Sequence, residues 1–144
     1  MTESIYSKYI LKNPEVKITK RIMPSVIESF SFEGRNADEP IEFSIALICV
    51  DLPHIMEEKP MVHEFDQILG FLGADTQNME NFEAEVELSL GREREIQRIT
   101  EPTVVYVPKG LAHCPINFKR IDKPIIFLDI SFTSDYKKGG YYIE

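Results

Sequence analysis

Residues 104–117 have the sequence VVYVPKGLAHCPIN, in which a β-branched run ends at a Pro-x-Gly turn and the chain returns with a histidine. Val and Tyr favour extended backbone, Pro108 fixes its own φ, and Gly110 can take the positive φ that a tight reversal needs. The segment therefore predicts a strand, a turn and a returning strand that carries His113 and Asn117.

Turn-forming residues recur along the chain, where nine prolines and seven glycines separate short apolar runs. Short runs rich in Val, Ile, Phe and Tyr between turn residues are typical of strands. We expect strands at residues 16–20, 41–50, 61–71, 83–90, 94–99, 103–107, 116–120 and 125–132. Residues 25–30 and 51–59 could each hold a helical turn or two between prolines. This pattern predicts an all-β sandwich or barrel.

Residues 83–90 show the clearest alternation. Their even-numbered side chains are apolar, whereas the odd-numbered ones are Glu83, Glu85, Glu87 and Ser89. Such a strand has one buried and one solvated face. After a turn at Gly91, we expect an antiparallel return to bring some of the next arginines opposite the glutamates; these are Arg92, Arg94 and Arg98.

Length and composition indicate one globular domain over residues 1–144, with 43% apolar and 28% charged residues. The net charge of −8 repels phosphate backbones and anionic lipid, so we expect neither nucleic acid nor a membrane surface as a partner. The first residues show no secretory signal, and the longest apolar run, 45–50, is too short to span a bilayer. With Cys49 and Cys114 interpreted as buried thiols, we expect a cytoplasmic protein.

A second segment, residues 61–73, has the sequence MVHEFDQILGFLG. On a continuous strand, His63, Phe65 and Gln67 would share one face with Met61 and Leu69. Glu64 and Asp66 would then lie on the opposite, solvated face. The side chains of His63 and Gln67 are therefore predicted to point into the same space.

These two segments resemble the paired motifs of the cupin superfamily. The family's second motif, Pro-x-Gly-x-x-His-x-x-x-Asn, is matched by Pro108, Gly110, His113 and Asn117. The resemblance covers about the last two thirds of the chain. It implies a cupin-type double-stranded β-helix, which is a jelly-roll barrel with its motif strands lining the interior. It also implies a homodimer, in which residues 1–40 form an arm that packs on the barrel or on a partner.

Many cupins hold a divalent metal, commonly iron, manganese, zinc or nickel, through three histidines and a glutamate. Here His63 and His113 match two of those ligands, but Met61 and Gln67 stand where the first histidine and the glutamate are expected. A thioether and a neutral amide supply no negative charge to a hard cation. Three alternatives stay open: a weak metal site at His63, Gln67 and His113 (with Met61 favouring a soft ion such as Cu(I)), a metal-free ligand pocket, or two core histidines.

The replacement of two metal ligands favours a small-molecule-binding protein with a pocket lined by His63, Gln67 and His113. The ligand would be a small organic molecule, such as a carboxylate or a sugar-like compound. Further walls of the pocket are expected from Met61, Phe65, Tyr106 and Asn117. The alternative is a metal-dependent cupin enzyme of the oxygenase, isomerase or lyase type that uses His63 and His113 as ligands. No catalytic residue is assigned. His54 is a surface histidine by default, and Cys114 should point away from His113 on a strand.

Overall fold

The protein is described by a computed structural model, which covers residues 4–12, 15–36, 41–136 and 140–143. Its elements are, in order, a 3-10 turn η1 (Ser7–Tyr9), β1 (Val16–Met23), β2 (Val26–Glu33), a 3-10 turn η2 (Gly34–Asn36), β3 (Ser44–Val50), β4 (His54–Met56), β5 (Met61–Val62), β6 (Gln67–Gly73), β7 (Ala84–Leu90), β8 (Glu95–Ile99), β9 (Thr103–Val107), β10 (His113–Ile121), β11 (Ile125–Ser131) and β12 (Tyr141–Tyr142). The all-β prediction is confirmed.

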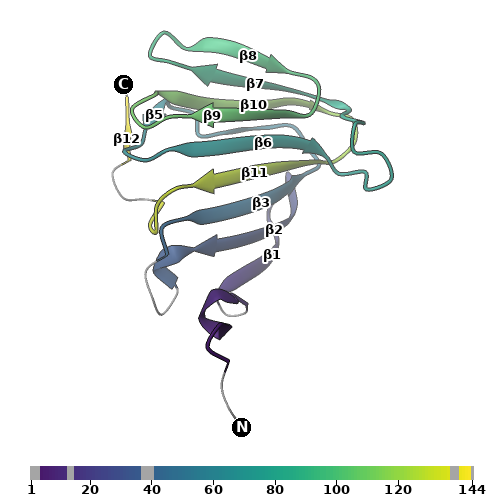
Figure 1. Ribbon diagram of the computed structural model, residues 1–144. Coiled ribbons are helices and arrows are strands. Elements are labelled where there is room, and N and C mark those ends of the chain that lie inside the picture. Colours follow the sequence, from purple (N-terminus) through teal and green to yellow (C-terminus); the bar gives the residue numbers. More distant parts are fainter. Residues whose placement is uncertain (1–3, 13–14, 37–40, 137–139, 144) are drawn as a thin grey trace.

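The strands form two antiparallel sheets. The first has the order β1-β2-β3-β11-β6-β9, and the second has the order β12-β5-β10-β7-β8, with β4 paired to β10. Figure 1 shows β1 and β2 at the far end of the first sheet, next to the N-terminus. The region expected as an N-terminal arm thus contributes two strands that extend the sheet beyond β3.

The core lies between the sheets. Phe71 and Phe127 from the first sheet pack against Phe118 from the second, with ring centroids 5.2 to 6.4 Å apart. These three rings are among the most buried side chains of the chain.

In the described part of the molecule, no helix is long and apolar enough to cross a membrane.

The alternation predicted for residues 83–90 is confirmed in β7, where Ala84, Val86 and Leu88 are buried. Arg98 on β8 forms an ion pair with Glu85, as expected for the returning strand. Arg92 and Arg94 precede β8 and lie in the turn, because β8 begins only at Glu95.

Three segments differ from the sequence predictions. Residues 25–30, expected to hold helical turns, belong largely to β2, because that segment pairs with β3 along its length. The strand expected over 61–71 is interrupted, since the backbone bends at residues 63–66 between β5 and β6. His63 and Gln67 are therefore not on one continuous strand. Residues 51–59 hold only the short strand β4.

Candidate functional site

The two motif segments meet at a pair of histidines. His113 begins β10 and pairs with Met61 of β5, which brings His63 beside it. The two imidazole centroids lie 5.1 Å apart, and the residues are only 3% and 2% exposed. The Pro-x-Gly turn helps to hold this arrangement, because Gly110 has a φ of +85° and its N–H donates to the His63 carbonyl at 2.9 Å.

His63 is enclosed by aromatic rings. It stacks on Phe65 at 4.6 Å and lies against Tyr136 at 5.2 Å. Neither ring nitrogen has a hydrogen-bond partner among the residues that the structure describes. Burial, reinforced by the charge that His113 would carry, lowers the pKa of His63 to about 4. The ring is therefore neutral at pH 7.

The chain returns past this ring near its C-terminus. A Cβ added at Gly140 would lie 2.9 Å from His63 Nδ1, so a side chain there would have to displace the imidazole or the backbone. Tyr142 follows in β12 and donates to Glu57 Oε2 at 2.8 Å. The C-terminal segment thus closes one side of the histidine pair.

His113 is also neutral at pH 7, for a similar reason. Burial lowers its pKa, and this effect is opposed by the Leu111 carbonyl and by the negative charge of Glu57. Its Nδ1 lies 3.2 Å from the Leu111 carbonyl oxygen, which makes Nδ1 the protonated nitrogen and leaves Nε2 as an acceptor.

Gln67 is almost fully buried near the histidines, at 1% exposure. Its Nε2 donates to Asp129 Oδ1 at 3.0 Å and to Ser131 Oγ at 3.1 Å. Its Oε1 has no hydrogen-bond partner in the described part of the chain. The amide therefore presents an unused acceptor in a buried position.

Sequence reasoning missed Asp129 and Ser131. Both lie on β11, in phase with the buried Ile125 and Phe127. Alternation with a period of two thus places a carboxylate and a hydroxyl on the inner face of the sheet. The signal was available in residues 125–131, whose sequence IIFLDIS contains one charged residue at an inward position.

The register of the first sheet gathers further polar groups beside them. Ser131 is paired with Ser44 on β3 and with Gln67 on β6, and Ser44 is paired in turn with Glu33 on β2. Directly paired residues share a face of the sheet. The inner face therefore carries a polar row across four strands, with Asp129 in the adjacent row.

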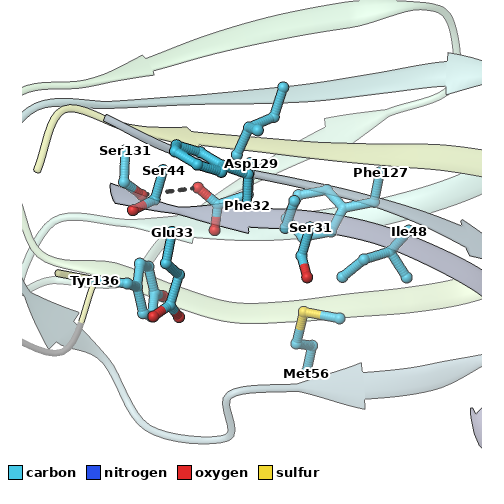
Figure 2. A pocket seen from close by; sticks show the side chains of 12 residues that line it. Ser31, Phe32, Glu33, Ser44, Ile48, Met56, Phe127, Asp129, Ser131 and Tyr136 are labelled. Carbon is cyan, nitrogen blue, oxygen red and sulfur yellow. Dashed lines mark hydrogen bonds between the residues drawn. The ribbon is translucent and has the colours of Figure 1, made fainter. Parts of the chain in front are cut away.

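Two adjoining cavities lie against this face. The larger, of about 190 Å³, is lined at one end by acidic and hydroxyl side chains and at the other by Ile48, Met56 and Phe127 (Figure 2). The smaller, of about 50 Å³, is lined by Gln67 and His113 among others. The cavities share four lining residues, namely Met56, Phe127, Asp129 and Tyr136. Asp129 thus stands at the junction of the two.

The other expected pocket residues lie elsewhere. Met61 is part of the core, and Tyr106 is 58% exposed with its hydroxyl bonded to Asp66. Asn117 alternates with the buried Ile116 and Phe118, which directs it to the outer face of β10. Tyr106 and Asn117 line neither of the two cavities. His54 stacks on Phe118 at 4.9 Å, which makes it part of the packing of β4.

Cys114 does not point away from His113. A register shift between His113 and Ile116 breaks the alternation, so both His113 and Cys114 are buried and line the smaller cavity. Burial raises the pKa of the Cys114 thiol to about 12, which keeps it protonated. Both cysteines are free thiols; Cys114 is buried as expected, whereas Cys49 is only half-buried.

The residues present do not fit the four-ligand metal site of the family motif. The Gln67 amide donates hydrogen bonds to Asp129 and Ser131, and the Met61 side chain packs in the core. Within residues 4–12, 15–36, 41–136 and 140–143, no three His, Cys, Asp or Glu side chains are grouped so that they could hold a metal ion. Two neutral imidazoles remain, without a carboxylate in position to complete the set.

Comparison with solved structures identifies the fold. Oxalate decarboxylase from Bacillus subtilis at pH 4.6 matches 88% of this chain, with a TM-score of 0.59 and 12% sequence identity. A structure of the same enzyme, from work on its Mn(II) centres, matches 89% with a TM-score of 0.58 and 11% identity. The chain spans only 30% of the length of each of these proteins. No family model and no curated protein matches the sequence. The likeness shows that the chain has the cupin jelly-roll fold that its motifs predict.

Proposed function

We propose that the barrel binds one small organic ligand in the larger cavity, against Asp129. An apolar cavity of ~150 Å³ is large enough to take up benzene, so a volume of about 190 Å³ suits a molecule of one ring with a small substituent. The cavity combines an apolar end with a few convergent polar groups, which is typical of ligand sites.

One observation carries this proposal: Gln67, which lines the adjoining smaller cavity and is hydrogen-bonded to Asp129 at the junction of the two, holds a buried acceptor whose hydrogen-bonding capacity is not used. Gln67 Oε1 has no partner among the described residues, although the residue is almost fully buried. A buried acceptor without a partner costs about 1–3 kcal/mol. Groups that are kept at such a cost are expected where a ligand completes the hydrogen bonds.

The competing hypothesis is a metal-dependent enzyme that uses His63 and His113. The pair supplies two neutral imidazoles, whereas Gln67 is bonded to Asp129 and Met61 is packed in the core. The identity of the coordinating side chains controls metal affinity, so this donor set favours the binding of a small molecule over metal catalysis.

The test is a thermal-shift screen of single-ring compounds, followed by calorimetric titration of the compounds that bind. Ala46 on β3 lines the larger cavity, so Ala46→Leu should fill it and weaken binding at least about tenfold. Ala74→Leu makes the same chemical change outside the lining of the cavity and should leave the affinity unchanged.

Equal affinity of the wild type and of Ala46→Leu would overturn the proposal. A metal-dependent turnover that His113→Ala abolishes would replace it with the competing hypothesis.

A further inference from the structure

The charges around the larger cavity have one sign. Asp129 and Glu33 contribute carboxyl groups to its lining, and Ser31, Ser44 and Tyr136 contribute hydroxyls. Figure 2 shows the Asp129 carboxyl projecting into the space between these side chains. Neither cavity has a lysine or an arginine among its lining residues, within the part of the chain that the structure describes.

The two carboxylates are not equivalent. Glu33 is already neutralised, because its Oε2 lies 2.5 Å from Arg35 Nε. Asp129 has no ion-pair partner in the described part of the chain. Its Oδ1 accepts hydrogen bonds from Gln67 and Ser131, whereas its Oδ2 accepts none from the described residues. One oxygen of a half-buried carboxylate thus remains available to a ligand.

Gln67 provides an independent observation at the same junction. Its Nε2 donates to Asp129 and Ser131, and the Tyr136 hydroxyl also lies within hydrogen-bonding reach of the Gln67 side chain. Its unpaired Oε1 can only accept. The junction of the cavities therefore offers two free acceptors, Gln67 Oε1 and Asp129 Oδ2, and it lacks a fixed cationic donor.

We propose that the ligand is a compact molecule with an apolar body and a cationic donor head, such as a primary ammonium group, which Asp129 binds. This inference rests on the proposed function and narrows it to one chemical class. The head would donate to Asp129 Oδ2 and Gln67 Oε1, while the body would lie against Ile48, Met56 and Phe127. The charge-assisted bond would compensate a carboxylate that is otherwise unpaired.

A carboxylate ligand, which the sequence allowed, is disfavoured by the same geometry. An anion in the larger cavity would face Asp129, and no lysine or arginine among the described lining residues would offset the repulsion. The similarity to oxalate decarboxylase therefore does not extend to the charge of the expected ligand.

The test compares three probes of similar size by calorimetric titration: benzylamine, benzyl alcohol and benzoate. Benzylamine, as its ammonium ion, should bind the wild type at least about tenfold more tightly than either other probe. Asp129→Asn keeps the shape of the side chain and removes its charge, so it should reduce the affinity for benzylamine to that for benzyl alcohol. Asp122→Asn makes the same change at an exposed position and controls for the net charge of −8.

A second measurement uses only the wild type. Benzylamine affinity should fall as the pH is lowered from about 8 to about 5, because burial raises the pKa of Asp129 to about 6 and protonation removes its charge. Benzyl alcohol should show no such dependence. The other ionisable groups that face Asp129 are Glu33, Glu57, His113, Cys114 and Tyr136. Of these, burial lowers the pKa of His113, and Cys114 and Tyr136 stay protonated because burial raises the pKa of each.

Equal affinity for benzylamine and benzyl alcohol, or an Asp129→Asn variant that binds benzylamine as tightly as the wild type, would overturn this inference. The proposed function would survive either result, provided that Ala46→Leu still weakens the compounds found by screening.

Discussion

Gln67 and Asp129, which are 62 residues apart in the sequence, are joined across neighbouring strands by a 3.0 Å hydrogen bond from Nε2 to Oδ1. The bond fixes the orientation of the amide and leaves its Oε1 unpaired among the described residues. It also places a glutamine, at the position where the family motif has a metal-binding glutamate, in contact with a carboxylate.

Asp129→Asn should stabilise the protein at high pH. Burial raises the pKa of Asp129 from 3.8 to about 6, so the native state keeps a proton that the unfolded chain has lost. The resulting stabilisation is present below pH 3.8 and is lost as the pH rises through 6. Urea unfolding at about pH 8 should show the variant more stable by about 1–2 kcal/mol, with little difference near pH 4. A variant that is less stable than the wild type at pH 8 would contradict this.

His63→Leu should reduce the sensitivity of the fold to acid. The unfolded histidine takes up a proton near pH 6.5, whereas burial and His113 hold the native pKa near 4. The wild type therefore loses stability as the pH falls from 6.5 to 4, by up to about 1.4 kcal/mol per pH unit for this group. Over part of this range the titration of Asp129 raises the stability as the pH falls. The measurement is therefore the difference in the free energy of unfolding between variant and wild type at each pH. Parallel stability curves for the two proteins would refute the prediction.

Gln67→Glu should destabilise the protein at neutral pH. The substitution replaces a donor to Asp129 with a second carboxylate in a buried position, at a cost of about 2–3 kcal/mol. The loss should shrink in acid, as the two carboxyl groups share a proton. Gln97→Glu is the matched control, because Gln97 Nε2 also donates to a carboxylate, that of Glu95 at 2.8 Å, but at an exposed position. The control should cost less than about 1 kcal/mol, since surface charges are screened. Equal losses for the two variants would show that Asp129 is not the cause.

Elemental analysis of the untagged protein should find less than one equivalent of metal. The double variant Met61→His/Gln67→Glu restores the ligand types of the family motif and should raise the affinity for Mn²⁺ or Zn²⁺ at least about tenfold. Near-stoichiometric metal in the wild type that is lost in His113→Ala would show that two imidazoles suffice here.

The strands of the fold could be predicted from local sequence wherever alternation and turn residues agree. Residues 84–90 form a strand with one apolar face, and Gly110 takes the positive φ that the turn requires. The motif resemblance correctly placed His63 near His113 and predicted the jelly-roll fold. Residues 25–30 were misassigned, because their strand conformation depends on pairing with β3, which lies later in the chain.

The sequence by itself determined the fold class, the free thiols and the histidine pair, because these follow from local propensity and from motifs of about ten residues. Only the tertiary structure decided which polar groups surround the cavities. The bend at residues 63–66 separates Gln67 from His63, and the irregular start of β10 turns Cys114 inward. Above all, the register between β6 and β11 brings Asp129 to Gln67. Alternation states only which face of its own strand a residue occupies, and the partner across the sheet is decided by packing of the whole barrel.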